Sequence, residues 1–150
     1  MSAPSDPVSA GVRAAGPLAE TCRQAQGSAN DLRLEVVRDL ALDLERQLGA
    51  LADLAREDGA PDVLAEAAIC CADLANLAAC NAPGLPRDAA PRAAAAVRLA
   101  AGAVDVLGPM VEAGSGDPGE DHAGNLIRDA RSAAWRAGFA ARLVEGFTKG

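Results

Sequence analysis

Residues 28–58 read SANDLRLEVVRDLALDLERQLGALADLARED, and this stretch decides the class of the fold. Its apolar residues recur at spacings of three and four, which places them on one side of an α-helix at about 100° per residue. Ser28 with Asp31 is typical of a helix start, and Gly59 with Pro61 is typical of a helix end. The predicted core side consists of Val36, Val37, Leu40, Leu44, Leu48, Leu51, Leu54 and Ala55.

On this core side, we expect Leu40, Leu44 and Leu51 to lie at the centre of the core. Leu42 falls among the charged residues of the opposite side, so we predict that it tolerates truncation. A helix of this length requires neighbours of similar length to bury its apolar side.

The rest of the chain predicts those neighbours. Periodic apolar residues, bounded by Pro, Gly or Asn, indicate long helices over residues 61–81, 88–107 and 117–145. Gly108 and Pro109 are expected to kink or break the second of these helices. A short helix over Pro17–Gln26 is predicted before the long helix, and residues 1–16 are interpreted as a flexible tail or a weakly helical lead-in.

The composition supports an all-α fold. The 150 residues include 37 alanines but only two Phe, one Trp and no Tyr, and alanine is the best helix former. Short connections between long helices favour antiparallel neighbours. We therefore predict an up-and-down four-helix bundle with a short extra N-terminal helix, formed by a single domain over residues 17–150.

The charge of the chain disfavours two classes of partner. The formal net charge is −7, so the sequence lacks the basic footprint expected of a protein that binds nucleic acid or an anionic membrane. By inspection, no apolar run approaches the roughly 18 residues that span a bilayer, and no secretion signal begins the chain. A cytoplasmic location without nucleic-acid or membrane partners is the resulting expectation.

The cysteines do not form a recognisable metal motif. Cys70 and Cys71 are adjacent, Cys80 follows, and His122 is the one histidine, but no C-x-x-C pair or Glu-x-x-His pair occurs. We interpret the cysteines as reduced thiols that act as small apolar residues, with Cys80 the most exposed. No metal, disulfide or cofactor is expected to hold the fold.

No nucleophile motif or phosphate-binding glycine loop identifies an enzyme or a family. Polar residues near apolar faces leave one alternative open, a small enzyme or metabolite-binding bundle with a pocket lined by Gln47, Asp105 and Asn125. We favour the interpretation of Gln47 as a buried amide that fixes helix register, and of Asp105 as the partner of Arg98.

Two apolar stripes lie outside the predicted core. They consist of Leu99, Val106 and Met110 on one helix and Trp135, Phe139 and Leu143 on the next. If these stripes lie side by side, they form an apolar patch large enough to mark an interface. The leading hypothesis is therefore a non-enzymatic, self-associating bundle that acts through protein contacts, by default as a homodimer. The alternative is that the N-terminal helix covers the patch within one chain.

Overall fold

The structure, a computed structural model, describes residues 7–26, 32–85, 87–117 and 119–148. Within these residues the elements are helical and no strand occurs. Their bounds are α1 Pro7–Gln26, α2 Leu32–Glu57, α3 Pro61–Asn81, the 3-10 turn η1 Ala82–Gly84, α4 Ala90–Gly114 and α5 Asp121–Thr148. The predicted all-α helical bundle is therefore confirmed.

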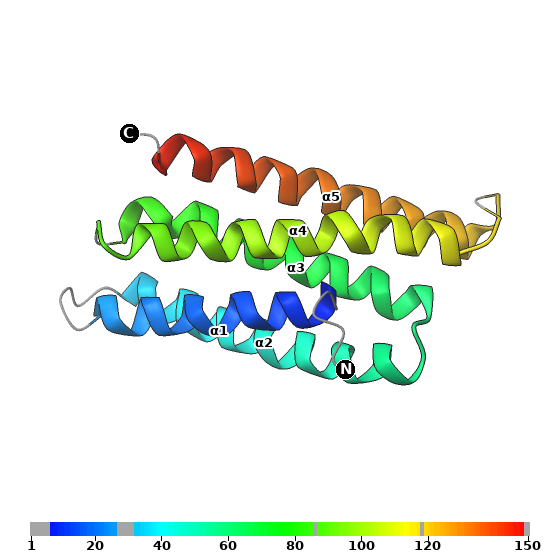
Figure 1. Cartoon of the computed structure of the whole chain (residues 1–150), viewed down its shortest axis with the longest axis horizontal. Helices are drawn as coiled ribbons and strands as arrows, with labels where there is room; N and C mark the ends of the chain where they lie inside the picture. The colour runs from blue at the N-terminus through cyan, green and yellow to red at the C-terminus, as the bar shows by residue number, and fades with distance from the viewer. Residues whose placement is uncertain (1–6, 27–31, 86, 118, 149–150) are drawn as a thin grey trace, which may run out of the picture.

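The helices are stacked in three tiers, with successive helices antiparallel (Figure 1). The central tier is formed by α3 and α4, which pack against each other. On one side of this tier α1 and α2 lie side by side, and on the opposite side α5 packs over both central helices. As a result α5 has one face on the bundle and one face turned outward.

The core is built mainly from small side chains. The largest fully buried residues are Leu and Val with two Cys, and most of the other core positions are alanine. Small residues at helix contacts let the backbones approach closely, which substitutes for the aromatic core that this sequence lacks. The contact faces of α3 and α4 are therefore rich in alanine.

The first helix is longer than predicted, because α1 begins at Pro7 and not at Pro17. Its residues Val8, Ala14, Ala15 and Leu18 are at most 1% exposed and pack in the core. The expectation of a flexible tail is therefore wrong for residues 7–16, where the helical lead-in is the correct alternative. Residues 1–6 lie outside the described residues.

The buried face of α2 is also rotated from the predicted one. The residues buried in α2 are Leu34, Val37, Ala41, Leu48, Leu51 and Ala52. By contrast Val36, Leu40 and Leu54 are 56%, 48% and 50% exposed, so the prediction that Leu40 is central is wrong. Alanines at the contact bring the helix axis closer to its neighbours, which leaves these larger side chains at the rim. Leu42 is exposed, as predicted.

The helix boundaries after α2 show a second difference. The third predicted helix matches α3, but α4 continues through Gly108 and Pro109 without the predicted break. The side chain of Pro109 is exposed, so its ring displaces no neighbouring helix. Gly116, with φ +84°, provides the left-handed backbone in the connection to α5.

The two central helices contradict the expectation that no apolar run of the chain approaches the length of a membrane span. Pro61–Gly84 and Ala90–Gly114 have mean hydropathies of 1.6 and 1.5 over 18-residue windows, so they are long and apolar enough to cross a membrane. The high values come from many alanines with few charges. In the bundle, 61% and 56% of the two windows are buried by the other helices, as in the core helices of a folded domain.

Candidate functional site

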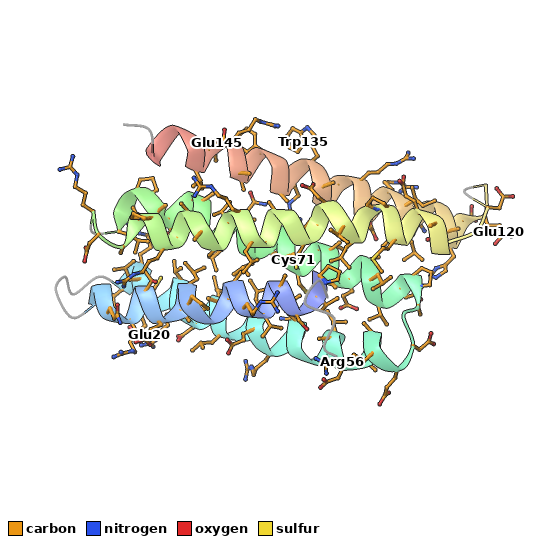
Figure 2. The ribbon with its side chains drawn as sticks, in the orientation of Figure 1. Glu20, Arg56, Cys71, Glu120, Trp135 and Glu145 are labelled. Carbon is orange, nitrogen blue, oxygen red and sulfur yellow. The ribbon has the colours of Figure 1, made fainter. Side chains whose placement is uncertain are left out.

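The outward face of α5 carries the two most prominent exposed aromatic side chains. Trp135 is 69% exposed and Phe139 is 44% exposed, one helical turn apart. Their ring centroids are 5.9 Å apart with an interplanar angle of 11°, so the rings stack on each other. Figure 2 shows Trp135 pointing away from the bundle. We call Trp135, Phe139 and the residues beside them on this side of α5 the aromatic face.

Local sequence explains why the aromatic face is turned outward. The opposite side of α5 is occupied by small or aliphatic residues that pack on α3 and α4. These are Ala130, Ala133, Ala137, Ala140 and Val144, all at most 1% exposed. Trp135 and Phe139 fall on the other side of the helical wheel from Ala137 at 100° per residue. Burying the alanine side therefore exposes the aromatic rings.

Two ion pairs fix the flanks of α5 to the central tier. Arg131 Nε donates to Glu112 Oε1 of α4 over 2.7 Å, and Arg136 pairs with Asp73 of α3. These pairs lie at the two edges where α5 meets its neighbours. The buried alanine side sets the rotation of α5 about its own axis, and these partly exposed ion pairs border that contact.

Two further arginines border the aromatic face. Arg128 and Arg142 are each seven positions from Trp135, which places them on the same side of α5. Among the described residues, neither guanidinium has a hydrogen-bond or ion-pair partner. The face therefore combines stacked aromatic rings with unpaired positive charges, the residue types enriched at the energetic centres of protein interfaces.

The structure does not bring the two predicted apolar stripes together. Leu99, Val106 and Met110 are 37%, 49% and 42% exposed, as expected for surface positions. However, Leu99 lines a groove against α1, and Met110 lines a hollow beside the start of α1 and the end of α2. The helix α5 packs along a different side of α4, so the predicted continuous patch is wrong.

The two stripes lie beside different parts of the bundle. The first helix lies beside Leu99 and Met110, which line hollows between α1 and α4. It does not reach the aromatic face. Leu143 is half-buried and packs against the core at the edge of that face.

The three residues of the predicted pocket are not neighbours. Gln47 is exposed on α2, where it donates to Asp43 and accepts a contact of 3.6 Å from the Cys70 thiol. Asp105 lines a groove of about 140 Å³ between α4 and α5, and Asn125 is exposed on α5. The structure therefore contradicts a single pocket lined by these side chains, and Gln47 is not a buried amide.

The four cysteines differ in their exposure to solvent. Cys22, Cys70 and Cys71 are buried, whereas Cys80 is exposed. Burial raises the pKa of the Cys70 thiol to about 11 and that of the Cys71 thiol to about 12, because an apolar environment disfavours the thiolate. These buried thiols are therefore protonated at neutral pH and unreactive.

The single histidine lies at the surface. His122 Nε2 is 3.0 Å from Asp62 Oδ1, and both side chains are mostly exposed. In the described parts of the chain, no group of three or more His, Cys, Asp or Glu side chains is placed to hold a metal ion. The sequence matches no protein-family model and no curated protein. Function is therefore inferred from the surfaces themselves.

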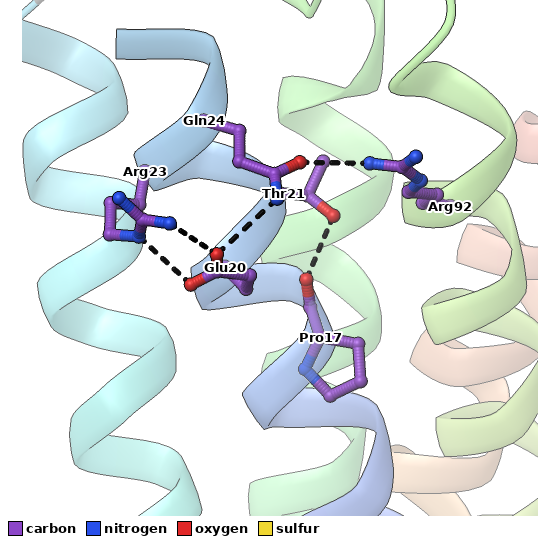
Figure 3. Close-up of polar contacts among 6 residues, drawn as sticks. All are labelled: Pro17, Glu20, Thr21, Arg23, Gln24 and Arg92. Carbon is purple, nitrogen blue, oxygen red and sulfur yellow. Dashed lines mark hydrogen bonds and ion pairs between the residues drawn. The ribbon is translucent and has the colours of Figure 1, made fainter. Parts of the chain in front are cut away.

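Sequence reasoning missed a groove between α1 and α4. It has a volume of about 350 Å³. Its lining residues are Arg13, Ala14, Pro17, Glu20, Thr21, Gln24, Arg92, Ala95, Ala96 and Leu99. Figure 3 shows the polar contacts at one end, where Arg92 of α4 reaches Gln24 of α1. The only available signal was the run of small residues at 93–96, which leaves space beside any helix that packs there.

Proposed function

We propose that this protein is a non-enzymatic, self-associating helical bundle whose chains pair through the aromatic face of α5. The observation that carries the proposal is the exposure of the stacked Trp135 and Phe139 rings on a helix whose position is otherwise fixed. A monomer in water leaves both rings hydrated, whereas a partner surface removes that apolar area from water. The expected assembly is a two-fold dimer, the commonest closed assembly of identical chains.

The shape of the face supports pairing of two α5 helices. At about 1.5 Å per residue, a helix of 28 residues is about 42 Å long. Two such helices packed along their length provide a contact of the order of a standard interface, about 800 Å² per partner. Because the stacked rings restrain each other and the flanking ion pairs hold the helix, little conformational freedom is lost on pairing.

The net charge of the chain favours this face over others. A chain of net charge −7 repels its own copies, and that repulsion is weakest where positive groups gather. Arg128 and Arg142 make the aromatic face a locally basic region of an acidic protein.

The test is the mass of the chain in solution, measured by sedimentation equilibrium over a range of concentrations. The wild-type chain is expected to dimerise, and Trp135→Ser with Phe139→Ser is expected to give a monomer with unchanged helix content. The matched control is Val36→Ser with Leu40→Ser on α2, which also removes two half-exposed apolar side chains. This control is expected to remain dimeric.

Two results would contradict the proposal. A wild-type chain that is monomeric at high micromolar concentration would exclude self-association as the function. A control variant that loses the dimer while the α5 variant keeps it would transfer the interface to the exposed side of α2.

A further inference from the structure

The groove between α1 and α4 has the form of a small-molecule site. Its volume of about 350 Å³ lies within the range of about 300–1,000 Å³ that ligand sites occupy. The floor is made by Ala14, Ala95 and Ala96, whose short side chains leave the space open. Arg13 and Gln24, the lining residues of α1 farthest apart, are separated by eleven residue steps, a length of about 16 Å. The cavity is therefore long, narrow and mostly apolar.

The charges around this groove are not balanced. In the described part of the chain the guanidinium of Arg13 has no ion-pair or hydrogen-bond partner. Arg92 is held by the neutral amide of Gln24, whose Oε1 accepts its hydrogen bond at 2.9 Å (Figure 3). The one carboxylate of the lining, Glu20, is engaged by Arg23, whose Nε donates to it at 2.9 Å.

Two arginines and one carboxylate line the groove. The hydrogen bonds from Arg23 lower the pKa of Glu20, and its carboxylate also accepts a hydrogen bond from Gln24 Nε2 at 3.3 Å (Figure 3). Arg13 and Arg92 therefore make the groove positive, although the chain as a whole carries −7. An apolar channel with an unpaired arginine at one end is complementary to a molecule with an anionic head and an apolar tail.

We propose that this groove binds a linear single-chain carboxylate, an acyl chain of about the length of laurate. The carboxylate pairs with Arg13, and the tail lies along the alanine floor toward Leu99 and Pro17. Bidentate pairing suits the planar guanidinium of Arg13, and the small floor residues leave room for an unbranched chain. This site shares no residue with the aromatic face and does not depend on self-association.

The experiment is isothermal titration of the full chain with laurate below its micelle concentration. Saturable binding of one laurate per chain is expected, with no such binding of dodecyltrimethylammonium, which carries the same tail and the opposite charge. Arg13→Gln is expected to weaken binding about tenfold, as for the loss of one charge-assisted hydrogen bond. The control Arg128→Gln, which also removes an unpaired arginine, is expected to bind as the wild type.

A second pair of variants tests the cavity independently of charge. Ala95 is exposed at the groove, so Ala95→Phe fills it without entering the core and is expected to abolish binding. Ala113→Phe places the same ring at an exposed position of α4 outside the groove and is expected to have no effect. Circular dichroism checks that each variant is helical.

Three outcomes would overturn the proposal: absence of saturation at one laurate per chain, equal binding of the cationic amphiphile, or full binding by Ala95→Phe. A shift of Trp135 emission that saturates together with laurate binding would place the ligand on α5 and would also overturn it. Binding by the Trp135→Ser, Phe139→Ser chain is expected to be unchanged, which separates this site from the proposed self-association.

Discussion

Replacing Gly11 with alanine tests the packing of residues 7–16 of α1, whose burial was not predicted from the sequence. A Cβ atom at Gly11 would lie 2.7 Å from Cys71 Sγ and 3.0 Å from Leu48 Cδ1. Both neighbours are fully buried, so they have no open space into which to move. Gly11 therefore marks a close approach of α1 to α2 and α3, and any side chain there must displace Cys71 or Leu48.

The expected magnitude follows from two opposed effects. Overpacking of a close-packed core costs about 1–3 kcal/mol, and the higher helix propensity of alanine returns about 1 kcal/mol. Gly11→Ala is thus expected to lower the free energy of unfolding by up to about 2 kcal/mol. In a chain of 150 residues this corresponds to a decrease in Tm of at most about 8 °C.

The matched control is Gly102→Ala in α4. An added Cβ at Gly102 meets no atom within 4 Å, so the propensity gain of about 1 kcal/mol is not opposed. Urea unfolding followed by circular dichroism, at one protein concentration for all chains, measures both changes. If Gly11→Ala is as stable as Gly102→Ala, then residues 7–16 do not pack against Leu48 and Cys71 and the position of α1 is wrong.

Leu48→Ala is expected to lower the free energy of unfolding by about 2–5 kcal/mol because Leu48 is fully buried, whereas Leu40→Ala is expected to lower it by less than about 1 kcal/mol. Urea titrations measure both changes, and equal losses of stability would contradict the orientation of α2. Cys80 is expected to be alkylated first and Cys71 last at neutral pH, as read by mass spectrometry, because Cys80 is exposed and Cys71 is buried as a protonated thiol. Above a pH of about 9 the unfolded chain releases thiol protons that the native chain retains, so the free energy of unfolding is expected to fall as the pH rises toward 11–12. The slope is at most about 1.4 kcal/mol per pH unit for each of Cys70 and Cys71. The chain has no Tyr, so a Cys70→Ala, Cys71→Ala variant with an unchanged slope would refute this assignment.

The class of fold was predictable because the relevant signals are local. Alanine-rich periodicity specifies helices, and Pro61 at the start and Asn81 before Pro83 at the end gave the bounds of α3 correctly. The exposure of Trp135 was also predictable, since it follows from the position of the alanine side of the same helix.

The orientation of α2 could not be obtained in the same way. Its apolar residues occupy more than one side, and a helical wheel does not show whether leucines or alanines face the neighbours. In the structure Ala41 and Ala52 are buried, where they permit close approach of the helices, and Leu40 and Leu54 lie exposed at the edge of the contact. This choice depends on the distance between helix axes, which is a tertiary property.

The extent of α1 and the groove beside it were hidden for a related reason. Gly11 and Pro17 are usual signals of a helix boundary, yet Gly11 is required by a close contact and Pro17 is accommodated within α1. The groove joins positions as distant as Gln24 and Arg92, which are 68 residues apart. Local periodicity contains no information on such pairs.

The most direct test of the central proposal uses the one tryptophan of the chain as a reporter. Trp135 lies at the centre of the proposed dimer contact and is 69% exposed in the single chain. Acrylamide quenching of its emission, measured over a dilution series, is predicted to weaken as protein concentration rises, with a shift of the emission to shorter wavelength. Quenching and emission that stay constant from nanomolar to high micromolar concentration would mean that Trp135 is never covered by a second copy, and would contradict self-association through α5.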